Sequence, residues 1–185
     1  DLTVEYTNLG DDTYGFKTTQ DTFSKTVIID PVPTRIWGSY FGGNGDEFGW
    51  LKPDRFDNIF LHGYTSSTNN VATSGSHQPT IMGGYDAFIN KISKDGQKLW
   101  GTYYGGNYSD ASGGLDFDNN DNIFVVADIS IPNPMYPGNT YYYFAQLAIL
   151  KFKPDGTLVF EKIFGGKSKD ISYDLRYYNN NIYII

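Results

Sequence analysis

Short runs in which apolar and polar residues alternate occur along most of the chain, and turn residues separate them. Alternation of this kind is typical of strands with one buried face. Asp95-Gly96 stands between two such runs, and a glycine there accepts the positive φ that a tight hairpin needs. Apolar residues nowhere recur at helical spacing for three turns. The pattern predicts an all-β chain, and in the first complete unit it predicts strands at about 48–53, 58–64, 86–92 and 98–104.

One phrase of the sequence occurs three times at a nearly fixed spacing. It runs from Trp37 to Gly43, from Trp100 to Gly106 and from Phe160 to Gly166, with its first residues 63 and then 60 apart. Each copy is followed by an acidic position and then by a hairpin motif that reads Asp-Asn-Ile-Phe or Asn-Asn-Ile-Tyr. A fixed period marks a repeated supersecondary unit, and we assign to it Trp37, Gly42, Gly43, Asp46, Trp100, Gly105, Gly106, Asp110, Phe160, Gly165, Gly166 and Asp170.

The repeat has the size and the content of a propeller blade. Four short strands in about 60 residues, with aromatic residues and paired glycines, are the pattern of a four-stranded antiparallel blade. We expect about two and a half blades in residues 37–185. Residues 1–36 are expected to be the end of a β-rich N-terminal domain and a linker, stiffened by Pro31 and Pro33. Because a propeller closes through about 4 to 8 blades, we expect this chain to be a fragment of a longer propeller.

Several strings of the sequence are similar to one known repeat. They are Ile28 to Pro31, the phrase from Trp37 to Gly43, and Gly83 to Phe88 leading into Lys94-Asp-Gly96. Together they resemble the bacterial β-propeller repeats known as SBBP repeats, over about residues 25–185. The resemblance implies a large protein that is secreted or exposed on the bacterial surface, as in many Bacteroidetes proteins with a C-terminal domain for type IX secretion. It implies no catalytic residue, and the second unit departs from it through an insertion rich in proline and tyrosine at 131–138.

Composition and charge narrow the functional classes. Aromatic residues make up 17% of the chain and glycine occurs 21 times, as half-buried sheets joined by tight turns require. The chain has no cysteine, so a disulfide framework and a thiolate metal site are excluded. A net charge of −7 argues against binding to nucleic acid or to an anionic membrane surface. No apolar run is long enough to span a membrane.

Residues that recur with the period are expected to serve the blade rather than a ligand. Asp46, Asp110 and Asp170 are predicted to accept backbone N–H groups in a turn. The paired glycines are predicted to permit positive φ and close backbone approach. They are no phosphate loop, because such a loop leads into a helix and carries a lysine.

One acidic loop has the oxygen-rich character of a calcium site. Asp116, Asp118 and Asp121 alternate with other residues in a segment that a hard cation could bind, which makes them a weak calcium candidate. The segment occupies the hairpin position of the repeat, however, and the other units offer no equivalent ligands there. An Asx-type turn is therefore the favoured interpretation, and no metal or cofactor is expected.

The sequence provides no set of residues that indicates catalysis. Of the two histidines, His62 lies in a strand among apolar residues and His77 lies in a loop without clustered carboxylates. A Ser-His-Asp assembly is disfavoured, although its members need not be adjacent in sequence. Asp46 and Glu47 are neighbours, so on a strand they would point to opposite faces and could not act as a glycosidase pair. No enzymatic activity is expected of this chain.

Aromatic residues that break the period are the candidates for binding. Trp50 stands where the other two units have Gly114 and Asp174, and a cluster occupies the insertion of the second unit. Exposed tyrosine and tryptophan suit contact with protein or carbohydrate, whereas the alternative is packing as local core over the blade edge. The candidate binding residues are Trp50, Met135, Tyr136, Tyr141, Tyr142 and Tyr143.

The sequence as a whole favours a non-catalytic scaffold or binding module of the bacterial surface, either secreted or exposed there, that contacts protein or glycan. Two alternatives remain open. One is a carbohydrate-active hydrolase with its catalytic residues on blades outside this sequence. The other is a cargo protein or accessory subunit of an outer-membrane protein assembly.

Overall fold

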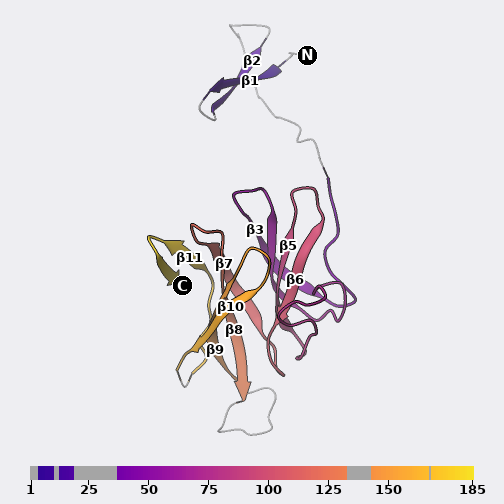
Figure 1. Ribbon diagram of the computed structural model, residues 1–185, viewed down its shortest axis with the longest axis vertical. Helices are drawn as coiled ribbons and strands as arrows, with labels where there is room; N and C mark the ends of the chain where they lie inside the picture. Colours follow the sequence, from indigo (N-terminus) through magenta and orange to yellow (C-terminus); the bar gives the residue numbers. More distant parts are fainter. Residues whose placement is uncertain (1–3, 11–12, 19–36, 133–142, 167) are drawn as a thin grey trace, which may run out of the picture. The chain divides into compact units, whose positions relative to one another are not determined.

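A computed structural model describes residues 4–10, 13–18, 37–132, 143–166 and 168–185 (Figure 1). The chain divides into an N-terminal part, Asp1–Ile36, and a C-terminal part, Trp37–Ile185. In the N-terminal part, β1 (Val4–Gly10) pairs antiparallel with β2 (Thr13–Thr18). Pro31 and Pro33 of the predicted linker lie outside the described residues.

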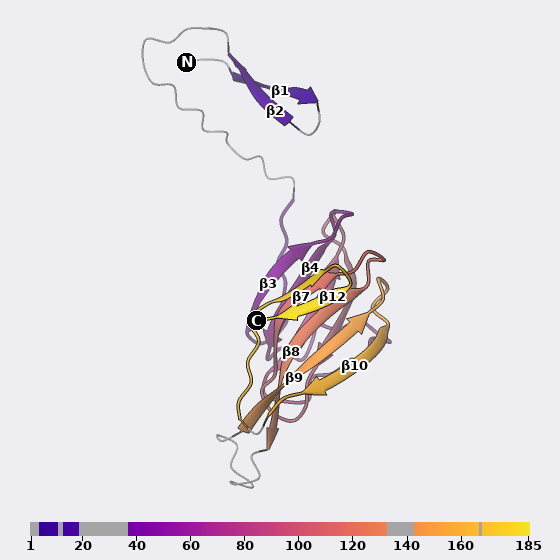
Figure 2. The same cartoon turned by 90° about the vertical axis from the view of Figure 1, so that its left-hand side faces the viewer.

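The C-terminal part contains two four-stranded sheets and a hairpin, which correspond to the three successive repeat units. The strands of each sheet follow one another in chain order, and every neighbouring pair is antiparallel. The first sheet consists of β3 (Glu47–Pro53), β4 (Ile59–Thr65), β5 (Asp86–Ile92) and β6 (Lys98–Tyr104). The second consists of β7 (Ala111–Phe117), β8 (Ile123–Pro132), β9 (Tyr143–Phe152) and β10 (Leu158–Phe164), and the hairpin of β11 (Leu175–Tyr178) and β12 (Asn181–Ile184) (Figure 2).

These elements confirm the predicted all-β class and the antiparallel four-stranded sheets. Both sheets are open, since their first and last strands do not pair with each other. The described residues contain no helix, and so none that is long and apolar enough to cross a membrane.

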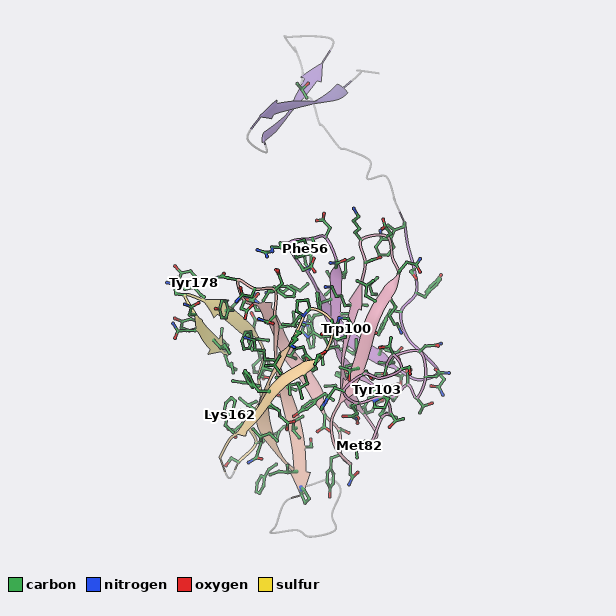
Figure 3. The ribbon with its side chains drawn as sticks, in the orientation of Figure 1. Phe56, Met82, Trp100, Tyr103, Lys162 and Tyr178 are labelled. Carbon is green, nitrogen blue, oxygen red and sulfur yellow. The ribbon has the colours of Figure 1, made fainter. Side chains whose placement is uncertain are left out.

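The two sheets and the hairpin are layers packed in the order of the sequence. Phe60, Ile89 and Trp100 of the first sheet share one buried cluster with Val125 and Leu150 of the second. Trp100 lies near the middle of the C-terminal part (Figure 3). The other face of the second sheet packs on the hairpin through a separate cluster that joins Phe124, Val126 and Leu175. Each sheet therefore buries apolar side chains against the unit that follows it.

A long connection covers the remaining face of the first sheet. Residues 66–85 link β4 to β5, and Val71 of this connection is fully buried against Phe88 and Tyr103. Its backbone also pairs with the edge strand β6, where Tyr103 N–H donates to the carbonyl of Gln78 at 3.0 Å. An edge strand that is covered in this way has fewer free backbone groups with which to pair with another chain.

The same tryptophan contact joins successive units. Trp37 Nε1 donates to the carbonyl of Lys94 at 2.7 Å, and Trp100 Nε1 donates to the carbonyl of Pro154 at 3.0 Å. Each indole covers the hairpin that precedes the last strand of the next unit. A Cβ at Gly156 would lie 2.7 Å from the Trp100 ring, and the φ of this residue is 88°, so glycine is needed there both for space and for backbone conformation.

Candidate ligand-binding groove

A groove of about 380 Å³ lies on the first strands of three successive units. These strands, β3, β7 and β11, follow one another across the upper half of the C-terminal part in Figure 1, and β7 contacts both of the others. We call this space the inner groove. It is lined by Trp50, Leu51, Lys52, His62, Gly113, Gly114, Leu115, Tyr173, Asp174 and Arg176.

Trp50 forms the aromatic wall of the inner groove. It lies directly across from His62 on the neighbouring strand, and the two rings stack with their centroids 5.9 Å apart. Phe48, two residues earlier and thus on the same face of β3, meets the indole edge-on at 5.2 Å. The Trp50 side chain is still 48% exposed, so part of the indole is open to a ligand.

Two glycines bring the third unit to the groove. A Cβ on Gly113 would collide with Ser172, and a Cβ on Gly114 would collide with the backbone of Asp174 and Leu175. Only residues without a side chain allow this close approach. The approach places Asp174 and Arg176 in the lining, together with Tyr173, whose side chain is exposed.

The charged groups of the inner groove are paired. Arg176 Nη1 donates to Asp174 Oδ1 at 2.8 Å, and both side chains are partly exposed. Lys52 Nζ lies 2.6 Å from Asp116 Oδ1 and also donates to the carbonyl of Leu115 at 3.1 Å. The groove therefore offers cationic donors and anionic acceptors without an excess of either charge.

His62 is a buried neutral side chain at the floor of the groove. Its Nδ1 lies 2.9 Å from Ser112 Oγ. The pKa of His62 is lowered to about 4, first by burial and then by the Lys52 cation, whereas Asp174 acts in the opposite direction. The imidazole is thus uncharged at neutral pH. Ser112 is only 1% exposed and is absent from the groove lining, so its hydroxyl does not meet a ligand there, and a serine-histidine nucleophile is not supported. His77 packs its ring against Tyr104 and Phe152.

A second hollow, of about 320 Å³, lies between the two sheets and contains two carboxyl groups. Burial raises the pKa of Asp110 to about 6, although Gly106 N–H and Ser130 N–H donate to it and lower the value, and Asp86 raises it. Burial also raises the pKa of Asp128, against hydrogen bonds from Ser172. Both groups are held by these structural hydrogen bonds. The hollow is lined by Tyr64, Tyr85, Ser109, Asp110, Ala111, Asp128, Ser130, Ala145, Lys169 and Ile171.

The paired glycines and the acid that follows them form one repeated turn. Gly106 N donates to Asp110 Oδ2 at 2.6 Å, and Gly166 N donates to Asp170 Oδ2 at 2.8 Å. A Cβ on the first glycine of each pair (Gly42, Gly105, Gly165) would press on the carboxylate of its own turn. In the first unit, Gly43 N donates to Glu47 Oε1 at 3.4 Å.

The acid of the first unit is therefore Glu47, one residue after the predicted Asp46. The reason is a β-bulge between Ser112 and Gly114, which adds one residue to the second unit. Counting back from the hairpin motif crosses this bulge and selects Asp46, whereas the glycine pair is four residues before the acid in all three units. Asp46 contributes through its backbone, which exchanges hydrogen bonds with Ser66.

The predicted calcium loop is an Asx-type turn in which each candidate ligand has another partner. Asp118 Oδ1 accepts the N–H groups of Asn120 and Asn122, both at 2.9 Å, as Asp54 does for Phe56 and Asn58 in the first unit. Asp118, Asp116 and Asp121 also form ion pairs, with Lys151, Lys52 and Arg55 respectively. Over the described ranges, no group of three or more side chains is arranged to hold a metal ion.

Calcium is expected to leave the stability unchanged. Because lysine and arginine side chains already neutralise these carboxylates, an added cation would have to displace them before it could bind. Thermal melts with calcium and with the chelator EGTA should give the same midpoint. A calcium-dependent rise of several degrees that is lost in the double variant Asp116→Ala with Asp118→Ala would contradict this result.

The other predicted binding residues fall largely outside the described part of the chain. Met135, Tyr136, Tyr141 and Tyr142 are not described. Tyr143 is the first residue of β9, where its backbone pairs with Pro132. Their role in binding stays a prediction. Trp50 is the one predicted binding residue that the structure places at a groove, whereas Tyr173 and Arg176 were missed, because nothing near them in the sequence indicates what they face.

The geometry defines a class of protein: an all-β domain of packed antiparallel units, with a mixed aromatic and charged groove on their first strands. No family model matches the chain, and no curated protein matches it. The interpretation of the groove therefore depends on its own residues.

Proposed function

We propose that residues 37–185 are successive blades of an incomplete β-propeller, and that they act as a non-catalytic binding module whose ligand lies in the inner groove. In propellers the blades surround a central channel. The chain-order packing of the units and the neighbouring first strands β3, β7 and β11 support this arrangement.

The observation that carries the functional proposal is the position shared by Trp50, Gly114 and Asp174. These residues occupy the same place in the three repeats, and all three line the inner groove. A position that served only the blade would keep one residue type, as the glycine pair does. Here the residue types differ between units while the location is common, which is the property of a recognition surface.

Exposed apolar side chains support further blades. Phe160 occupies the place of Trp37 and Trp100 in the repeat, yet it is 40% exposed, and Ile163 and Phe164 on the same strand are exposed as well. Exposed apolar patches of this kind mark surfaces that another element covers. Further strands of the same propeller would cover them as the second sheet covers Trp100.

The groove favours binding over hydrolysis. Its histidine is neutral and buried, its serine is covered, and its carboxylate Asp174 is paired with Arg176. The histidine is buried and Asp174 is held in an ion pair, so neither is a free general acid or base for hydrolysis. The resemblance to SBBP repeats supports a location outside the bacterial cell, where protein or glycan of a surface would be the partner.

Trp50→Ala is expected to abolish ligand binding without unfolding the protein. Bacterial-surface polysaccharides and peptide libraries, immobilised as arrays, can be probed with the purified chain. Tyr178→Ala is the matched control, because Tyr178 is an exposed aromatic residue at the tip of the β11–β12 hairpin (Figure 3) and is absent from the groove lining. Ligands that Trp50→Ala loses and Tyr178→Ala retains support the proposal. Binding that is equal in both variants, or release of cleaved products, would contradict it.

A further inference from the structure

An unbroken series of aromatic rings runs along the face of β3 and β4 that contains Trp50. From Trp50 the next ring is Phe48 at 5.2 Å, then Tyr64 at 5.4 Å, then Tyr85 at 5.6 Å. Phe48 and Tyr64 are direct cross-strand partners, so their rings share one side of the sheet. We call these four residues the aromatic ladder.

The aromatic ladder connects two hollows that differ in their lining. Trp50 lines the inner groove, while Tyr64 and Tyr85 line the second hollow beside Asp110 and Asp128. Phe48, between them, is 52% exposed, so the middle of the ladder is open to solvent as well. A ligand that lies on the ladder would therefore be elongated and would meet polar groups at both ends.

Both ends of the aromatic ladder contain carboxyl groups as well as cationic side chains. At the Trp50 end, Arg176 is paired with Asp174. At the Tyr85 end, Lys169 is close enough to Asp128 to act on its ionisation, and Asp110 is a second carboxyl group in the same lining. Such pairs can donate and accept hydrogen bonds at once, but neither end has an excess of positive charge to attract an anion, and the whole chain has a net charge of −7.

We infer that the aromatic ladder is the binding track for a linear neutral oligosaccharide; this inference rests on the proposed function. Sugar rings have apolar C–H faces that can lie on aromatic side chains, and hydroxyl groups around their edges that both donate and accept hydrogen bonds. An uncharged chain of sugars can stack on the rings of the ladder and can form hydrogen bonds with the polar groups at both of its ends. An extended peptide would instead pair with the free edge of β3, the outermost strand of its sheet, and would not require the ladder.

The test measures affinity against ligand length. Cello-, xylo- and manno-oligosaccharides from disaccharide to octasaccharide are titrated into the protein by calorimetry, with oligogalacturonates of equal length as the charged comparison. Affinity is expected to rise with length until the ladder is spanned, and the oligogalacturonates are expected to bind more weakly. Phe48→Ala should lower the affinity for the long oligosaccharides by about tenfold and leave that for disaccharides nearly unchanged. Phe48→Tyr, which keeps the ring, should retain binding, as should Tyr178→Ala.

The outcomes separate the inference from the proposed function. A peptide ligand that requires Trp50, with no oligosaccharide bound, overturns the inference and leaves the proposed function standing. Oligosaccharide binding that does not depend on length or on Phe48 also overturns the inference. If no ligand of any class depends on Trp50, both are wrong.

Discussion

Trp100→Ala should lower the free energy of unfolding by about 3 to 5 kcal/mol, as large-to-small changes at buried aromatic residues do. Trp100 is 8% exposed and packs against Phe60 and Phe152, with ring centroids 5.9 and 6.1 Å away. Its removal leaves a cavity between the two sheets and takes away the indole hydrogen bond to the carbonyl of Pro154, which keeps only the longer one from Lys91 Nζ at 3.5 Å. Urea denaturation followed by far-ultraviolet circular dichroism measures the loss.

Trp37→Ala provides the matched control. Trp37 makes the same contact with a hairpin but is 38% exposed, so it removes less buried surface. Trp37→Ala should lower the free energy of unfolding by less than half as much as Trp100→Ala does. Equal losses in the two variants would show that the environment of Trp100 is not the buried one described above.

Two buried groups should give opposite changes of stability on acidification. His62 has a folded-state pKa of about 4, below its usual 6.5, so the unfolded chain takes up the proton first and stability is lost as pH falls from about 6.5 to 4. Asp110 has a folded-state pKa of about 6, above its usual 3.8, so the folded protein takes up the proton first and stability is gained as pH falls from about 6 to 4. Each effect is about 3 kcal/mol, and Asp128, whose pKa is also raised, adds to the second.

Single variants should show the pH dependence of stability that each group causes, because in the wild-type protein the two effects cancel. Between pH 7 and pH 4.5 the wild-type free energy of unfolding should change little, since the two effects oppose each other. His62→Gln should become more stable on acidification, and Asp110→Asn less stable. The groups that act on these two residues are Lys52 and Asp174 for the histidine and Asp86 for the aspartate. Parallel pH profiles for His62→Gln and wild type would contradict the assignment of His62.

The strands could be predicted because their signals are local. Alternation and turn residues gave the ends of β3 to β6 within one residue, and the repeated phrase placed Trp37 and Trp100 in register. The acid of the first turn was displaced by one residue because the bulge at Gly113 has no signal of its own; a count from the glycine pair would have found Glu47.

The inner groove could be predicted only in part. Trp50 was found because it departs from the repeat at a position where Gly114 and Asp174 also differ. Tyr173 and Arg176 could not be found, since they reach the groove through packing between units about 60 residues apart in sequence. The cover over the first sheet was missed for a similar reason: Val71 lies in a stretch without alternation, and its burial depends on a face that a different strand presents.

The indole contact between units has an evolutionary consequence. The unit formed by the first sheet contains both halves of the joint: Trp100 in its last strand and, just before that strand, the glycine turn on which the preceding Trp37 lies. A duplicated gene segment of one period would therefore encode a new unit that already fits its neighbours on both sides. Lengthening such an array requires no compensating mutation at the joints, so selection is free to alter the groove residues of each copy independently.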